Sequence, residues 1–130
     1  MTDPIFIRAD APELQRWSDE RLGRAQYRLL VDASGGPSRA IVQGLLYMER
    51  GDREALHRHP DHPETVHVIE GEGVAQFPGR SVPLHPGDTL FVPAGTPHGW
   101  AAPDTDMTLI FTFPADRLAN VAFRFEGEPA

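Results

Sequence analysis

Apolar residues occur along most of this chain in short runs, and several runs alternate apolar with polar positions. In "ETVHVIEG", residues 64–71, Val66 and Val68 alternate with the polar residues Thr65 and His67. Such alternation is typical of a strand with one buried face. The pattern predicts strands over residues 25–32, 39–49, 55–59, 64–71, 73–79, 81–88, 89–95, 97–102 and 107–113.

Glycine- and proline-rich segments separate these runs, among them "SGGP", "RGDR", "HPGD" and "PAGTP". Such segments favour tight turns. The 13 prolines also count against a helical fold, because proline interrupts helices but is tolerated at the ends of strands. We therefore expect an all-β domain, either a sandwich or a barrel.

The two ends of the chain are less regular. In "DAPELQRW", residues 10–17, Asp10 is a candidate N-cap and Glu13 follows three residues later, as in a capping box. This pattern predicts a short N-terminal helical segment. Near the other end, "VAFRF", residues 121–125, fits either a closing strand or a segment that reaches a neighbouring subunit.

Length and composition fit one domain that spans residues 1–130. The net charge of −7 argues against nucleic acid or an anionic membrane as a partner. No apolar run is long enough to span a membrane, and the start lacks the basic and apolar regions of a secretory signal, so a cytoplasmic location is expected. The absence of cysteine excludes disulfides, thiolate ligands and a cysteine nucleophile.

The segment "HRHPDHPETVH", residues 57–67, concentrates histidines beside a glutamate. His57 and His59 are two residues apart, so on a strand both imidazoles point to the same side. Glu64 begins the next expected strand, and His98 follows a turn much further along. Three imidazoles and one carboxylate suit Fe, Mn, Ni, Co, Cu or Zn rather than calcium or magnesium.

The other three histidines are expected to take no part in metal binding. His62 lies between prolines in a turn, and His85 lies just before another turn. His67 is three residues from Glu64, so alternation places it on the opposite face of its strand.

Two separated motifs give the chain a resemblance to the cupins. The first, G-x5-H-x-H-x3,4-E-x6-G, is matched over residues 51–71, and the second, G-x5-P-x-G-x2-H-x3-N, over residues 87–102. Ala102 replaces the final asparagine, a position that does not bind metal in that family. The matching residues are Gly51, His57, His59, Glu64, Gly71, Gly87, Pro93, Gly95 and His98.

The resemblance implies a double-stranded β-helix, the jelly-roll or cupin barrel. It also implies one divalent transition metal per chain, held by His57, His59, Glu64 and His98. A homodimer with sheets extended across the interface is expected on the same grounds.

Three residues are candidates for a catalytic role beside the ion. Trp100 shares the face of His98 and is placed to wall a pocket. Glu64 is a candidate base if it leaves the metal. Tyr47 is the third candidate. It qualifies if its face of the strand turns inward instead of the face that carries Leu46 and Met48, and alternation does not decide which face is inside.

Three classes of function remain open at this point. A redox-active ion fits dioxygenase chemistry on a small molecule. An ion that acts as a Lewis acid fits a lyase or an isomerase, provided that a base or phenol lies nearby. The third class is a small-molecule-binding protein without catalysis, because a fold alone does not define a function.

Overall fold

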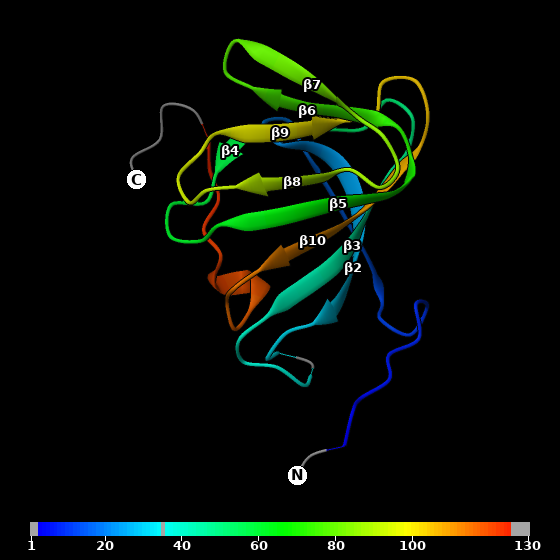
Figure 1. Cartoon of the computed structure of the whole chain (residues 1–130), viewed down its shortest axis with the longest axis vertical. Helices are drawn as coiled ribbons and strands as arrows, with labels where there is room; N and C mark the ends of the chain where they lie inside the picture. The colour runs from blue at the N-terminus through cyan, green and yellow to red at the C-terminus, as the bar shows by residue number, and fades with distance from the viewer. Residues whose placement is uncertain (1–2, 35, 126–130) are drawn as a thin grey trace.

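A computed structural model describes residues 3–34 and 36–125 of the chain. Residues 1–2, 35 and 126–130 of the expected domain lie outside the described residues. The described part is almost entirely β-structure and forms a curled antiparallel sheet (Figure 1). None of its helices has the length and apolar character needed to cross a membrane.

Nine of the strands overlap the nine expected runs, although several are shorter, and the first and last strands were not among those runs. They are β1 (Leu14–Asp19), β2 (Gly23–Val31), β3 (Val42–Met48), β4 (Arg53–Arg58), β5 (Glu64–Gly71), β6 (Gly73–Phe77), β7 (Arg80–Leu84), β8 (Thr89–Val92), β9 (His98–Ala101), β10 (Met107–Phe113) and β11 (Arg124–Phe125). A short 3-10 helix, Leu118–Asn120, lies between β10 and β11.

Strand order along the sheet is β7-β6-β9-β4-β2-β3-β10-β5-β8, with β1 added beside β2 and β11 beside β4. Every pair is antiparallel, and many neighbours are far apart in sequence, as in a jelly roll. Figure 1 shows β6, β9 and β4 at one side of the curled sheet and β5, β10 and β3 at the other. The all-β jelly-roll prediction is therefore confirmed.

The core lies inside this curl, where alternating side chains of the strands meet. On β3 and β10 buried and half-buried positions alternate without interruption. Leu46 and Met48 are among the buried residues of β3, and they lie opposite Leu109 and Met107 of β10 in the sheet register. The question that alternation alone left open is thus decided in favour of the Leu46 face.

The predicted N-terminal helical segment is wrong. Residues Leu14–Asp19 form strand β1, which pairs with β2 so that Trp17 lies opposite Ala25. The turn to β2 is fixed by Asp19, whose carboxylate accepts backbone hydrogen bonds from Arg21 and Leu22. Pairing with the edge of β2 and packing of Trp17 against the core stabilise the strand more than the weak local helix propensity stabilises a helix. Tertiary contacts often override local propensity in this way.

The C-terminal segment closes the sheet within the same chain. Arg124 and Phe125 of β11 pair with Arg58 and His57 of β4. Just before this strand, Phe123 stacks on the His57 ring with a centroid separation of 5.2 Å. The "VAFRF" segment therefore forms a closing strand beside the histidine-bearing strand β4.

Candidate metal centre

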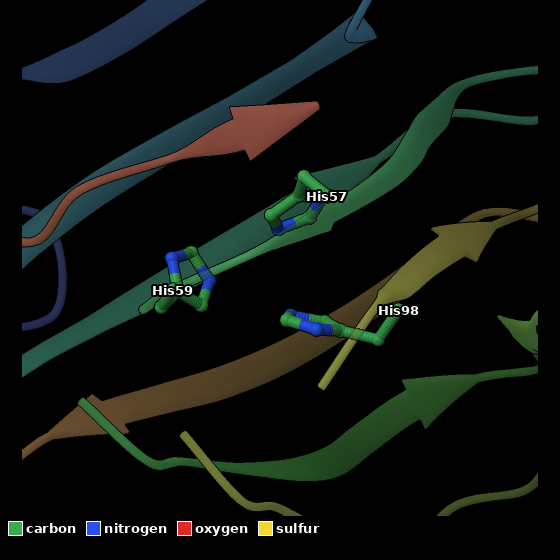
Figure 2. A group of neighbouring side chains, drawn as sticks. All are labelled: His57, His59 and His98. Carbon is green, nitrogen blue, oxygen red and sulfur yellow. The ribbon is translucent and has the colours of Figure 1, made fainter. Parts of the chain in front are cut away.

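Strands β4 and β9 bring three histidines into one cluster. His57 lies directly opposite His98 in the sheet register, and His59 follows the last residue of β4. The three ring centroids are 4.4–5.0 Å apart, and the rings converge as Figure 2 shows. All three side chains are buried, with at most 2% of their surface exposed.

Backbone carbonyls fix the tautomer of each ring. In His57, His59 and His98, Nδ1 lies within hydrogen-bond distance of a carbonyl oxygen. A carbonyl only accepts, so each Nδ1 carries a hydrogen, and Nε2 is the nitrogen that each ring turns toward the cluster. The pairs are His57 with Ala55 at 2.7 Å, His59 with Ala122 at 3.0 Å and His98 with Thr96 at 2.8 Å.

The environment keeps His57 in the neutral form that binds metals. Burial, together with the neighbouring His98, lowers the pKa of His57 to about 3. Its Nε2 atom is buried and has no hydrogen-bond partner. A buried lone pair without a donor is costly, and a cation at this point would satisfy it.

Glu64 adds a carboxylate to the three imidazoles. Its Oε1 atom lies 3.0 Å from Nε2 of His98 and 3.4 Å from Nε2 of His59. Burial by itself raises the pKa of Glu64, but the contacts with His59 and His98 outweigh burial and hold the pKa below its ordinary value. The three histidines therefore fit a transition-metal ion, and Glu64 is close enough to two of them to add a carboxylate ligand.

A tight turn sets His98 beside His59. Gly95, in the turn before β9, donates its backbone N–H to the carbonyl of His59 at 2.8 Å. Gly95 has φ of 80°, a conformation that glycine adopts without strain. The second motif, which contains Gly95 and His98, is thus joined to the first motif by a main-chain hydrogen bond to His59. The histidine cluster joins the two motifs as well.

Glu54 is a second carboxylate at this site, and the sequence analysis missed it. It is 6% exposed, and its Oε1 atom lies 3.2 Å from Nε2 of His57. Glu54 is three residues before His57, so simple alternation places it on the opposite face. The register between β4 and β9 shifts between these residues, however, and this bulge turns Glu54 inward. In the sequence, the signal that could have marked the bulge is Gly99, a glycine inside an expected strand.

The two carboxylates differ in their electrostatic surroundings. Burial, and then the charge of Glu64, raises the pKa of Glu54 to about 8. Two acidic groups so close together in a buried site cannot both ionise cheaply without a cation. The geometry therefore pairs an ionised Glu64 with a Glu54 whose charge depends on what occupies the site.

A cavity of about 240 Å³ opens beside the carboxylates. Glu54 and Glu64 provide its charged wall, and most of the remaining wall is aromatic or aliphatic. Its lining residues are Trp17, Leu22, Tyr27, Leu46, Glu54, Glu64, Trp100, Leu109, Phe111, Phe113, Leu118 and Phe123. A wall of this kind suits a small, largely apolar ligand that presents a polar group to the histidine cluster.

The structure brings two of the three candidate catalytic residues together. Glu64 and Trp100 both line the cavity, and the Trp100 ring centroid is 5.3 Å from that of His98. Tyr47 does not join them: it is half-buried on the outward face of β3 and lines a separate surface hollow. The phenol in the cavity wall belongs instead to Tyr27 of β2.

The remaining histidines lie outside the cluster. His67 is exposed, and its Nδ1 atom lies 2.7 Å from the Thr89 hydroxyl. His85 is exposed near Asp88, at 3.5 Å. Within the described residues, His57, His59 and His98 form the group suited to hold a metal, because their ligand atoms all lie within 4.8 Å of one another.

Comparison with known proteins places this site in a family. The cupin domain model matches residues 44–113. Dimethylsulfoniopropionate lyase DddW from Ruegeria pomeroyi is 25% identical over 122 residues, 94% of this chain and 80% of that protein. Quercetin 2,3-dioxygenase from Bacillus subtilis is 35% identical over 80 residues, which cover 62% of this chain and only 23% of that enzyme.

A solved structure shows the same fold. The polyketide cyclase RemF from Streptomyces resistomycificus superposes with a TM-score of 0.81 over 98% of this chain and 88% of that one, at 20% sequence identity. The matched model spans more than half of the chain and encloses both motifs and the three histidines. This chain therefore belongs to the cupin domain family.

Proposed function

We propose that this cupin is a metal-dependent enzyme that acts on a small, largely apolar molecule. One observation carries the proposal: an aromatic cavity meets three buried imidazoles through a wall that contains Glu64. Glu64 links the two parts, because it lines the cavity and its Oε1 atom lies 3.0 Å from Nε2 of His98. An ion held by the histidines would therefore lie near a substrate in the cavity.

Dioxygenase chemistry is the activity we favour. A redox-active ion such as iron, manganese, nickel, cobalt or copper would supply activation of dioxygen or of the bound substrate. The chain itself would orient an aromatic substrate between Trp100 and Phe113 and exclude water from it. The Bacillus subtilis quercetin 2,3-dioxygenase, which is 35% identical over the aligned segment, supports this choice.

Lyase or isomerase chemistry is the second candidate, and a specific observation favours it. Tyr27 presents a phenol in the cavity wall, where it can hold or move a proton while an ion such as zinc acts as a Lewis acid. The similarity to dimethylsulfoniopropionate lyase DddW extends over 94% of the chain, which supports the same candidate.

The test begins with the metal content of protein purified without an affinity tag. Anaerobic reconstitution with single metals then precedes two assays, oxygen uptake with flavonols and other aromatic diols, and elimination from β-substituted carboxylates. Oxygen uptake that depends on substrate and is lost in His98→Ala supports the dioxygenase. Elimination without oxygen uptake supports the lyase and contradicts the dioxygenase.

Failure of both assays with a stoichiometrically loaded protein would contradict the enzyme proposal. A cupin that binds a small molecule without converting it would then be the remaining function. The Tyr27→Phe variant separates the two chemistries further, because loss of the phenol should abolish proton transfer and leave oxygen uptake largely intact.

A further inference from the structure

We propose that Glu54 is a second carboxylate ligand of the metal, placed on the cavity side of the ion and displaced when substrate binds. This inference rests on the metal site proposed above and adds a fifth protein ligand to it. The position of one atom, Oε1 of Glu54, relative to the histidine cluster and the cavity supports it.

The distances fit ligands that share one ion. With bonds of about 2.1 Å, two neighbouring ligand atoms are roughly 3.0 Å apart in an octahedral shell and roughly 3.4 Å apart in a tetrahedral one. Glu64 lies 3.0 Å and 3.4 Å from Nε2 of His98 and His59. Glu54 lies 3.2 Å from Nε2 of His57, which is within the same range.

His57 supplies no hydrogen to its contact with Glu54. The ring hydrogen of His57 is on Nδ1, where it is donated to the Ala55 carbonyl. Nε2 has no hydrogen-bond partner, although Oε1 of Glu54 is only 3.2 Å away. An ionised Glu54 that faces this lone pair is stabilised by a cation between the two atoms, whereas a protonated Glu54 would donate its own hydrogen to Nε2.

Charge balance supports a second carboxylate as well. A divalent ion with neutral imidazoles and Glu64 alone leaves one net positive charge in a buried site. Glu54, when ionised, cancels it, since two carboxylates match a divalent ion. A neutral cluster costs less to bury than a charged one, so a second carboxylate stabilises a bound divalent ion.

Glu54 is also well placed to leave the ion. It lines the cavity, so an incoming ligand meets this carboxylate first. Glu64 contacts both His59 and His98, whereas Glu54 contacts His57 alone. An octahedral ion with five protein ligands has one position left, so a substrate that binds through two oxygen atoms requires the departure of Glu54.

The test uses cobalt as the probe, because the visible absorption of Co²⁺ responds to the number and kind of its ligands. Co²⁺ is titrated into the metal-free full-length protein, its Glu54→Gln variant and a matched control, Glu70→Gln, in which an exposed carboxylate of β5 is changed. Affinity is measured by competition with a chromophoric chelator. Near-ultraviolet circular dichroism checks that each variant is folded.

We expect Glu54→Gln to bind Co²⁺ at least tenfold more weakly and with altered visible bands, and Glu70→Gln to match the parent. Unchanged bands would overturn the proposal even if affinity falls, because a residue that merely positions a ligand also lowers metal affinity. If Glu54→Gln folds poorly, Glu54→Asp, which withdraws the carboxylate, should show the same spectral change, and bands like those of the parent would contradict the proposal.

The His98→Ala variant separates this inference from the proposed function. Loss of Co²⁺ binding there, with parental bands in Glu54→Gln, would leave the metal site in place and remove Glu54 from it. Parental Co²⁺ binding in His98→Ala would instead contradict the metal site itself.

Discussion

Glu54 and His57 point to the same side of β4 although an odd number of positions separates them, and their Oε1 and Nε2 atoms are 3.2 Å apart. The register explains this: Glu54 pairs with Trp100 and His57 with His98, so that two residues of β4 lie opposite Gly99 alone. The bulge places a carboxylate where regular pairing would have placed an apolar side chain.

The bulge depends on Gly99, and its replacement gives a first prediction. A Cβ atom at this position would lie 2.5 Å from the Glu54 carbonyl oxygen, which is too close. We expect Gly99→Ala to lower the free energy of unfolding by about 1–3 kcal/mol and to weaken metal binding by displacing Glu54 and His57. Urea unfolding and metal titration measure the two effects.

Gly36→Ala is the matched control for this substitution, because a Cβ atom there meets nothing within 4 Å. Equal stability and equal metal affinity in Gly99→Ala and Gly36→Ala would show that the bulge does not require a glycine.

Metal content should depend on the clustered histidines and not on the others. His57→Ala and His98→Ala each remove an Nε2 ligand, so we expect at least a tenfold loss of bound metal with the barrel still folded. Elemental analysis after dialysis checks this. His62→Ala and His67→Ala are the controls; a clear loss in either would place a ligand outside the cluster.

The stability of the metal-free protein should have its maximum at mildly acidic pH. The pKa of His57 is about 3 in the folded chain against an ordinary 6.5, so the unfolded chain binds more protons and stability falls as pH drops below 6.5. The pKa of Glu54 is about 8 against an ordinary 4.5, so the folded chain binds more protons and stability falls as pH rises from 4.5 to 8.

Between pH 4.5 and 6.5 these two slopes oppose one another. Above pH 6.5 we expect a loss of roughly 1 kcal/mol per pH unit in the parent, measured by urea unfolding in the presence of a chelator. Glu54→Gln should abolish this alkaline loss. A parallel loss in both proteins would mean that Glu54 is not its source.

Trp100 should affect the substrate more than the metal. Its side chain is 1% exposed and lines the cavity next to His98. We expect Trp100→Phe to keep the metal content of the parent and to raise KM several-fold by removing part of the aromatic wall. Trp100→Ala should also cost about 3–5 kcal/mol of stability. A Trp100→Phe enzyme with parental KM would exclude Trp100 from the substrate site.

We also propose that the protein is a homodimer. Several large apolar side chains are exposed on the single chain, including Ile69 and Phe91 on the outward faces of β5 and β8. Light scattering coupled to size exclusion is expected to give a mass about twice the 14.4 kDa of one chain. A mass of one chain across the working concentration range would contradict the dimer.

Much of the fold was accessible from the sequence because its strands are short, strongly alternating and bounded by glycine and proline. β5, with its inward Glu64, Val66 and Val68, is an example: its bounds and its buried face agree with the alternation. The three histidines of the cluster were accessible for a different reason, since their spacing in the two motifs is local to β4 and to the turn before β9.

Other features required the tertiary structure. Residues of β1 carry a helix-like signal, and only the neighbouring edge of β2 makes them a strand. Alternation could not choose between the two faces of β3; packing against β10 turned Leu46 inward and left Tyr47 on the other side.

The sequence by itself determined the class of fold and the histidines of the site, because both depend on local spacing. The charge and shape of the site were decided by tertiary contacts. Glu54 faces inward only because β4 bulges against β9. Tyr27 reaches the cavity from β2, and Trp17 reaches it from β1, which pairs with β2. Register shifts and sheet curvature arise from pairing between distant strands, and a single strand does not carry that information.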